Sequence, residues 1–202
     1  MKNHTDLINH LAGLIKAESY LEIGVFNPDH NFNHIVIKKK VGVDPAVNAP
    51  HIIRDFSDEY FYLLKEQTKF DIIFIDGLHH ADQVKKDFDN ALKHLTDKGI
   101  IVLHDCNPPT EPTTCVPRGA QREWCGDVYK FACTISEYPN LDFHTVDFDY
   151  GCTVVWRSPG RPAGKSVGKI TWQKFQANKR KLLALINVDK FLEKFPANEI
   201  EV

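Results

Sequence analysis

The sequence predicts an α/β fold built on a doubly wound, mostly parallel sheet. Short β-branched segments alternate with amphipathic helical segments along the first half of the chain, an order typical of this fold class. Two segments, 70–76 and 99–105, are almost continuously apolar, as strands covered on both faces of a parallel sheet must be. At 202 residues the chain fits one domain, because domains run to roughly 100–200 residues.

Five elements are expected in the first third of the chain. They are an amphipathic helix at 7–15, strands at 19–25, 40–44 and 51–54, and a helix at 57–65. Thr5 and Ser57 are the expected N-caps, since their hydroxyls can accept a hydrogen bond from a free backbone N–H. Asn27-Pro28 follows the first strand as a turn that can open a helix.

The rest of the sheet follows the same alternation and closes with a hairpin. Its elements are strands at 70–76 and 99–105, a helix from 84 to 95 ended by Asp97-Lys98-Gly99, a helix at 122–138, and strands at 142–148 and 152–157. The Asp149-Tyr150-Gly151 turn makes the last two strands antiparallel. Residues 1–158 are therefore expected to form the sheet domain. Residues 159–202 are expected to form a linker and a helical tail, packed on the same domain or on a second subunit.

Charge and hydropathy exclude two classes of partner. With 25 basic and 27 acidic residues the formal net charge is −2, so no cationic surface is expected to recruit nucleic acid. No apolar run approaches the roughly 18 residues of a membrane span, and the first ten residues lack the apolar stretch of a signal peptide. We therefore expect a cytoplasmic protein.

The cysteines gather in one part of the chain. Four of the five are Cys106, Cys115, Cys125 and Cys133. Their odd total and the absence of a C-x-x-C pair argue against a disulfide framework and a structural zinc site, so we interpret them as reduced. The polar, Pro-rich segment 106–125 lies where such folds carry substrate loops. Arg118, Arg122 and Trp124 can hold an anionic or sugar substrate there, or can simply be solvated.

Polar residues at the carboxyl ends of the predicted strands are the candidate site. Ligands of open α/β sheets bind beyond these ends, at the point where the strand order reverses. The residues there are Glu22, Gly24, Asp44, Asp76, His104 and Asp105. A carboxylate beside a buried strand is costly to desolvate without a partner, so this number of acids indicates a binding site. The alternative is that Asp76 and Asp105 only cap turns and His104 is a core histidine.

One spacing points to the class of cofactor. Asp44 follows Gly24 by about 20 residues, the offset at which an acid accepts hydrogen bonds from ribose hydroxyls. This spacing predicts an adenosine-containing cofactor. The full G-x-G-x-x-G motif is missing, because residues 25–28 occupy the turn that would cradle a pyrophosphate. A nucleotide-dependent oxidoreductase is therefore the second hypothesis.

Four segments together carry a family resemblance. YLEIGV, VGVDP, FDIIFIDGLH and GIIVLHDCNP, in this order and spacing, resemble the motifs of class I S-adenosylmethionine (SAM)-dependent methyltransferases over residues 19–157. The D-G-L-H motif at 76–79, paired with Asp105, is similar to metal-assisted O-methyltransferases of sugars and other small hydroxylated molecules. The segment TWQKFQANKRKLLALI is similar to the C-terminal helix of small bacterial enzymes of this group. The resemblance implies a Rossmann-like methyltransferase sheet and SAM as the cofactor.

The resemblance also implies a role for individual residues. Those assigned to SAM are Glu22 and Gly24 near its methionine part, Phe26 and Asn27 in the first turn, Asp44 at the ribose, Phe56 and Ser57 near the adenine, and Asp76 beside the sulfonium. Asp76 and Asp105 are the implied Mg²⁺ ligands and join His79, the implied base, as the catalytic residues. Two features depart from the family: the first loop is poor in glycine, and His104-Asp105 stands where some metal-dependent relatives have two adjacent acids.

We therefore expect an enzyme that transfers a methyl group from SAM to a hydroxyl of a sugar or other small molecule. A hydroxyl is a poor nucleophile, so loss of its proton needs a base such as His79, whose ordinary pKa is about 6.5, or a cation. The non-enzymatic alternative is a catalytically degenerate cofactor-binding module. The helical tail is compatible with a lid or with a homodimer contact.

Overall fold

Residues 1–197 are described by the computed structural model, as eight strands, six α-helices and three short 3₁₀ helices. The strands are β1 Ser19–Ile23, β2 Lys39–Val43, β3 Ile52–Ile53, β4 Phe70–Ile75, β5 Leu95–Leu103, β6 Leu141–Val146, β7 Cys152–Arg157 and β8 Leu185–Ile186. The α-helices are α1 His4–Ile15, α2 Ser57–Leu63, α3 Ala81–Lys93, α4 Val128–Ala132, α5 Trp172–Leu182 and α6 Val188–Lys194. The 3₁₀ helices are η1 Phe32–His34, η2 Glu111–Thr114 and η3 Ile135–Glu137.

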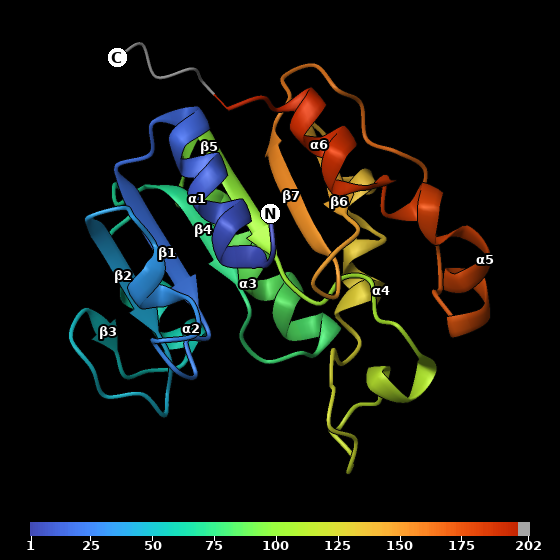
Figure 1. Ribbon diagram of the computed structural model, residues 1–202, viewed down its shortest axis with the longest axis horizontal. Coiled ribbons are helices and arrows are strands. Elements are labelled where there is room, and N and C mark those ends of the chain that lie inside the picture. The colour runs from blue at the N-terminus through green and yellow to red at the C-terminus, as the bar shows by residue number, and fades with distance from the viewer. Residues whose placement is uncertain (198–202) are drawn as a thin grey trace.

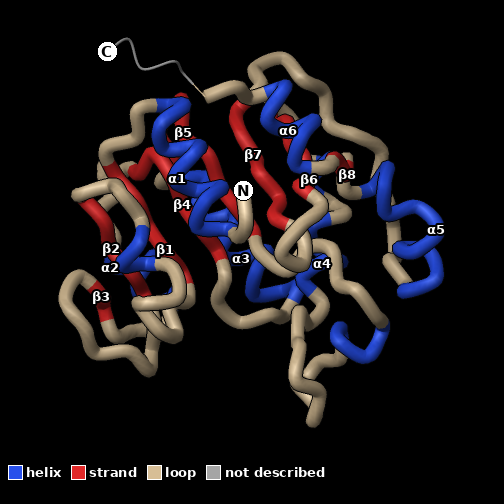
Figure 2. Tube along the Cα trace, viewed as in Figure 1, coloured by secondary structure: helices blue, strands red, loops and turns tan. Residues whose placement is uncertain are grey.

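All eight strands form one sheet with helices on both faces (Figures 1 and 2). The strand order is β3-β2-β1-β4-β5-β7-β6-β8, and β7 alone runs antiparallel to its neighbours, β5 and β6. One apolar cluster joins one face of the sheet to α1 and α6, and the other joins the opposite face to α2, α3, α4 and α5. This three-layer arrangement confirms the predicted doubly wound sheet with an antiparallel hairpin.

The strand order reverses between β1 and β4. From β1 the sheet continues to β2 and β3 on one side, and from β4 to β5 on the other. At such a point the chain leaves the two neighbouring strands toward opposite faces of the sheet. The two connections therefore diverge, and a crevice forms above the strand ends. The residues that follow Ile23 and Ile75 therefore border the crevice.

Both N-cap predictions are wrong. Helix α1 begins one residue before Thr5, and Asn3 is its cap, with Oδ1 accepting from the N–H of Asp6 at 3.1 Å. Thr5 instead donates through Oγ1 to Asn31 at 2.9 Å, because it faces the core. Helix α2 begins at Ser57 itself, after Phe56.

Three boundaries also differ from the prediction. Asn27-Pro28 opens a turn followed only by η1, and the predicted helix at 122–138 shortens to α4 and η3. The segment Asp97-Lys98-Gly99 lies inside β5 and does not end α3, because β5 already pairs with β4 at Leu95 opposite Phe70. The remaining strands match the prediction to within two residues.

The tail after residue 158 extends the same sheet. Strand β8 pairs in parallel with β6, with Thr145 opposite Leu185. Phe175 of α5 is fully buried and packs against Tyr129 of α4, with ring centroids 4.5 Å apart. Phe191 of α6 is fully buried against the opposite face. Within residues 1–197, no helix has the length and apolar character needed to cross a membrane.

The tail should contribute to the stability of the whole sheet. We expect Phe175→Ala to lower the free energy of unfolding by about 3–5 kcal/mol, because truncation of a fully buried phenylalanine leaves a cavity. Tyr62→Ala, at a side chain that is 88% exposed, is the control and should change it by less than about 0.5 kcal/mol. Urea unfolding followed by circular dichroism measures both. Equal, small effects would contradict this role of the tail.

Candidate active site

A cavity of about 760 Å³ opens at the carboxyl ends of β1, β2 and β4. Eight of the residues predicted for the cofactor or for catalysis line it, namely Glu22, Gly24, Phe26, Asp44, Phe56, Ser57, Asp76 and His79. Asn27 is not among the lining residues, and Asp105 lies behind the lining rather than in it. The structure thus brings most of the predicted cofactor residues around one cavity at the reversal of strand order.

Gly24 allows the two central strand ends to approach each other. Its φ is +85°, in the left-handed region that favours glycine, and its N–H donates to the carbonyl of Val43 at 2.9 Å. A Cβ at this position would lie 2.2 Å from the carbonyl oxygen of Asp76 and 2.5 Å from Cα of Gly77. No side chain fits there without moving the backbone that carries Asp76.

Asp44 shapes the turn after β1. Its Oδ2 accepts from the N–H groups of Val25 and Phe26 at 3.1 and 2.8 Å, and its Oδ1 accepts from Ala46 at 2.8 Å. Phe26 has φ +51° and is 83% exposed at the cavity rim. Asn27 supports the same turn through Oδ1, which accepts from the N–H of Asp29 at 3.1 Å. A carboxylate here therefore replaces the missing glycines in setting the turn.

Glu22 is a buried acid within a polar network. Its Oε2 accepts from the Tyr20 hydroxyl at 2.6 Å and from Nδ2 of Asn31 at 2.8 Å, and Asn31 also accepts from Thr5 of α1. The side chain is almost fully buried, and burial raises the pKa of Glu22 to about 8, with the nearby charge of Asp76 adding to the effect. Glu22 is therefore mostly protonated at neutral pH.

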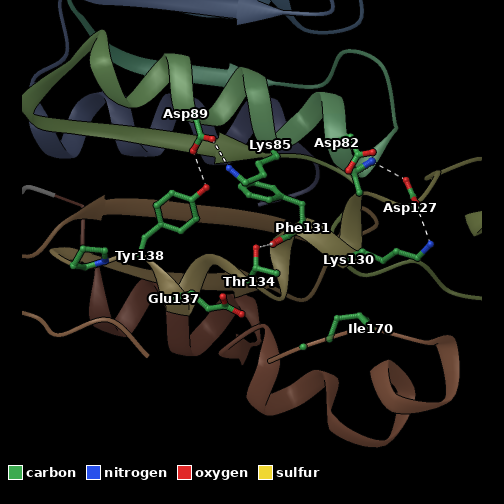
Figure 3. A pocket seen from close by; sticks show the side chains of 13 residues that line it. Asp82, Lys85, Asp89, Asp127, Lys130, Phe131, Thr134, Glu137, Tyr138 and Ile170 are labelled. Atoms are coloured by element: carbon green, nitrogen blue, oxygen red, sulfur yellow. Dashed lines mark hydrogen bonds and ion pairs between the residues drawn. The ribbon is translucent and has the colours of Figure 1, made fainter. Parts of the chain in front are cut away.

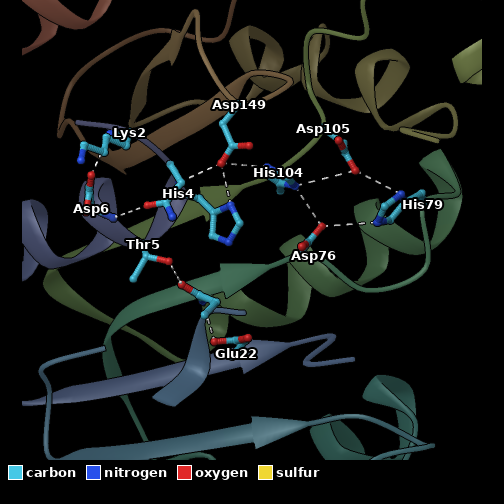
Figure 4. Close-up of polar contacts among 12 residues, drawn as sticks. Lys2, His4, Thr5, Asp6, Glu22, Asp76, His79, His104, Asp105 and Asp149 are labelled. Carbon is cyan, nitrogen blue, oxygen red and sulfur yellow. Dashed lines mark hydrogen bonds and ion pairs between the residues drawn. The ribbon is translucent and has the colours of Figure 1, made fainter. Parts of the chain in front are cut away.

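Asp76, His79 and Asp105 meet at one side of the cavity (Figure 4). His79 lies between the two carboxylates, with Nε2 3.3 Å from Oδ1 of Asp76 and Nδ1 3.1 Å from Oδ2 of Asp105. Its Nδ1 is also 3.1 Å from the carbonyl oxygen of Trp124. Both ring nitrogens thus face oxygen acceptors, an arrangement that fits a protonated imidazole.

His104 links this group to a second cluster that the sequence did not predict. Its Nδ1 is 3.3 Å from Oδ1 of Asp76, and its Nε2 is 3.6 Å from Oδ2 of Asp149 in the β6–β7 turn. His4, at the start of α1, lies 2.7 Å from the same Asp149 oxygen through Nδ1. His4 and Asp149 are 145 residues apart in the chain, so no local spacing could have brought them together.

The acids and imidazoles shift one another's pKa values. Burial opposes ionisation of Asp76, but the charges of His104 and His79 outweigh it and hold the pKa of Asp76 well below its ordinary value. Burial raises the pKa of Asp105. Burial also disfavours the imidazolium forms of His79 and His104, yet Asp76 in particular raises the pKa of both rings above the ordinary value. His79 and His104 therefore favour their protonated forms, and Asp76 favours its ionised form.

The loop after β5 supplies one wall of the cavity. The ring of Trp124 stacks on that of His79, with centroids 4.9 Å apart and planes at 20°. The guanidinium of Arg118 lies 5.5 Å from the centroid of the Trp124 ring, and both side chains line the cavity. Arg122 is exposed and contributes only its carbonyl, which accepts from Arg118 at 3.3 Å. Arg118 and Trp124, but not Arg122, are placed to touch a ligand.

The five cysteines are all free. Cys106, Cys125, Cys133 and Cys152 are buried, and burial raises the pKa of their thiols. Within the part of the chain that the structure describes, no group of three metal-ligating side chains includes a cysteine. These four cysteines thus act as small buried residues, and Cys106 directly follows Asp105.

A second cavity, of about 590 Å³, lies between α3, α4 and the segment before α5 (Figure 3). Its charged side chains are engaged with their neighbours: Asp89 pairs with Lys85 at 2.5 Å and accepts from the Tyr138 hydroxyl at 2.7 Å, and Lys130 pairs with Asp127 at 3.0 Å. None of the residues predicted for the site lines this cavity. The first cavity is therefore the candidate active site.

Part of the chain matches a known protein family. Residues 10–106, just under half of the chain, match the family model of a methyltransferase domain. No curated protein sequence matches the chain. The matched residues include β1, β2 and β4 and end just after β5, so they contain Glu22, Gly24, Asp44, Asp76, His79 and Asp105.

Solved structures of low sequence identity share the fold. A putative O-methyltransferase from Klebsiella pneumoniae is 17% identical over 77% of this chain and 80% of its own, with a TM-score of 0.58. An O-methyltransferase from Bacillus cereus in complex with S-adenosylhomocysteine (SAH) is 12% identical over 77% and 80%, with a TM-score of 0.56. The MycE methyltransferase of mycinamycin biosynthesis, in complex with Mg and SAH, is 16% identical over 87% of this chain and 54% of its own, with a TM-score of 0.50. The chain therefore shares its fold with these methyltransferases, and residues 10–106 match a methyltransferase domain, in agreement with the resemblance.

The protonated state of Glu22 should appear in the pH dependence of stability. Its pKa is about 8 in the folded protein against 4.5 for the ordinary group, so its contribution is fully present below about pH 4.5 and is lost as the pH rises through about 8. Glu22→Gln resembles the protonated acid and should remove up to about 1.4 kcal/mol per pH unit from the decline in this window. Urea midpoints at several pH values measure both proteins. Parallel pH profiles would contradict a buried, protonated Glu22.

Proposed function

We propose that this protein is an enzyme that transfers a methyl group from SAM to a hydroxyl of a small molecule, such as a sugar. The observation that carries the proposal is the group formed by Asp76, His79 and Asp105 beside the cavity at the strand reversal. These side chains offer a base and two hard oxygen ligands next to space for a cofactor. Methyl transfer is an in-line displacement, so holding the acceptor oxygen opposite the sulfonium is the main task of the protein.

Three parts of the cavity would hold SAM. Gly24 leaves room at the tight approach of β1 to β4, where the methionine part would lie beside protonated Glu22. The ribose would lie against Asp44, whose orientation is fixed by its hydrogen bonds to the turn. Phe56 is 64% exposed at the rim, and Ser57 is beside it, where the adenine would pack. Support comes from the solved neighbours in complex with SAH.

Asp76 and Asp105 are the residues that would hold a cation. Oδ1 of Asp76 is buried and lacks a hydrogen-bond partner, although two histidine nitrogens lie 3.3 Å away. Carboxylate oxygens suit Mg²⁺, and the MycE structure contains Mg. Bound there, Mg²⁺ would lower the pKa of a coordinated hydroxyl of the acceptor.

His79 would take the proton of the acceptor hydroxyl. The charges of Asp76 and Asp105 favour a proton on each nitrogen of its ring, so the base forms only when one of these protons leaves. Sharing the two carboxylates with a cation favours that loss, because their charge no longer stabilises the imidazolium. Trp124 stacks on the ring and keeps it oriented toward the cavity.

Trp124 and Arg118 support a small polar acceptor. The indole offers an apolar surface for a sugar or aromatic ring, and the guanidinium of Arg118 can donate hydrogen bonds to oxygen atoms of the acceptor. Both belong to the loop between β5 and α4, which is part of the sheet domain rather than a separate substrate domain.

SAM binding is the first test of the proposal. Isothermal titration of the wild type with SAM and SAH should show binding, and Gly24→Ala should abolish it, because the added Cβ would meet the Asp76 carbonyl. Gly13→Ala in α1 is the matched control, since no heavy atom lies within 4 Å of its added Cβ. If titration with SAM at about millimolar concentration shows no heat of binding, the proposal is overturned. Binding of NADH but not SAM would support an oxidoreductase instead.

Loss of the base should reduce turnover more than binding. On acceptors with vicinal hydroxyls, we expect His79→Ala to lower kcat by about 10²–10⁴, the usual contribution of a positioned base, with SAM affinity changed by less than about threefold. His80→Ala is the matched control, because His80 precedes α3 and makes no capping hydrogen bond through its side chain. The rate of methyl transfer is measured as the amount of SAH released over time.

Two outcomes would change the proposed chemistry. SAM binding without turnover on any acceptor would indicate a degenerate cofactor-binding module. Rates unchanged by a chelator would remove the metal and leave the histidine mechanism in place.

A further inference from the structure

We propose that His4, His104 and Asp149 bind a transition-metal ion of the zinc class, at a position separate from the Asp76–Asp105 pair. The three side chains come from three distant parts of the chain: the start of α1, the loop after β5, and the β6–β7 turn. Figure 4 shows His4 and His104 converging on Asp149, on the far side of His104 from Asp76 and Asp105. The proposal does not depend on methyl transfer.

The ligand atoms already lie close together. One ligand atom from each residue lies within 4.8 Å of the other two. Nδ1 of His4 is 2.7 Å, and Nε2 of His104 is 3.6 Å, from the same Oδ2 of Asp149. Bonds of about 2.0–2.2 Å at tetrahedral angles place two ligands of one zinc ion about 3.3–3.6 Å apart, so binding requires side-chain movements of about 1 Å.

The state of His104 is independent evidence for a ligand. Its side chain is nine-tenths buried, and its Nε2 is buried without a hydrogen-bond partner. A buried polar nitrogen without a partner has lost its hydrogen bonds to water and gained none in exchange, so such atoms are rare unless another group binds them. This nitrogen faces the position between His4 and Asp149.

The chemistry of the three donors selects the class of ion. Two imidazoles and one carboxylate suit Zn²⁺, Co²⁺, Fe²⁺ or Ni²⁺, whereas Mg²⁺ favours oxygen ligands alone. Asp76 and Asp105 offer two oxygen ligands, and His104 can join them only through Nδ1, the nitrogen that faces them. The group of His4, His104 and Asp149 has the larger share of nitrogen ligands and should therefore prefer metals of the zinc class more strongly.

Asp76 and Asp105 would support His104 as a metal ligand. A neutral imidazole that binds a metal through one nitrogen usually donates the N–H of the other to a carboxylate, which fixes the ring. Nδ1 of His104 is 3.3 Å from Asp76 and 3.7 Å from Asp105, so the required acceptors are in place when Nε2 binds the ion. The ring of His4 is held as well, stacked on Phe74 with centroids 5.3 Å apart.

By binding His4 together with His104 and Asp149, the ion would link the start of α1 to the sheet. His4 lines the cofactor cavity, while His104 and Asp149 belong to the loop after β5 and to the hairpin turn. A shared metal would hold these three segments together beside the cavity. We therefore expect the ion to stabilise this wall of the cavity.

Cobalt titration tests the proposal on the full chain without an affinity tag. After treatment with a chelator, the wild type should bind one Co²⁺ with visible absorption bands and should show a higher Tm with Zn²⁺. His4→Ala and Asp149→Asn should each weaken Co²⁺ binding at least tenfold and abolish the shift in Tm. Asparagine is chosen at position 149 because it tolerates the residue's φ of +47°.

The controls separate this site from other histidines and from the Asp76–Asp105 pair. His34→Ala removes an exposed histidine of the N-terminal region outside the cluster and should leave Co²⁺ binding unchanged. Unchanged Co²⁺ affinity in His4→Ala and Asp149→Asn would overturn the proposal, since the ion would then sit with Asp76 and Asp105. Absence of Co²⁺ and Zn²⁺ binding by the wild type would also overturn it. The melting curves without metal show whether each variant is folded.

Discussion

The contact between Gly24 and the Asp76-Gly77 peptide is the constraint on which the candidate site depends. It brings the ends of β1 and β4 closer than any side chain allows, with an added Cβ only 2.2 Å from the Asp76 carbonyl. Because both strands end there, the cavity opens directly above this contact, and Glu22, Asp44 and Asp76 surround it. A larger residue would displace the backbone that orients Asp76 and, through it, both histidines.

Charge balance is the second constraint on the site. Asp76, Asp105 and Asp149 bring three carboxylates to one buried region, and His79, His104 and His4 are the nearest groups that can carry positive charge. Buried carboxylates are stable only with such partners. Addition or loss of a cation therefore changes the protonation of several neighbours at once, which couples the proposed base to the proposed metals.

Most of the sheet and part of the site could be predicted from the sequence, because both follow from local patterns. Apolar runs predicted β4 and β5, and the polar residues that follow the strands were expected to meet at one edge of the sheet. The predicted helix caps were wrong, because a hydroxyl such as that of Thr5 can bond either to its own helix or to a distant residue such as Asn31. His4 and Asp149 could not be found, because only the folding of α1 and the hairpin onto the same strand ends brings them together. Asn27 does not line the cavity; its side chain bonds within the turn, where Oδ1 accepts from the N–H of Asp29.

The pairing of β8 with β6 has a consequence for how the chain reaches its native state. Strand β6 is the second strand from one end of the sheet, and its outer edge is covered only by the two residues of β8. An uncovered edge of this kind presents unpaired N–H and C=O groups that can recruit another chain. Until residues 185 and 186 pair with it, the end of β6 at Thr145 and Val146 leaves such groups open to another chain. The last strand therefore covers part of an edge that would otherwise be available for association.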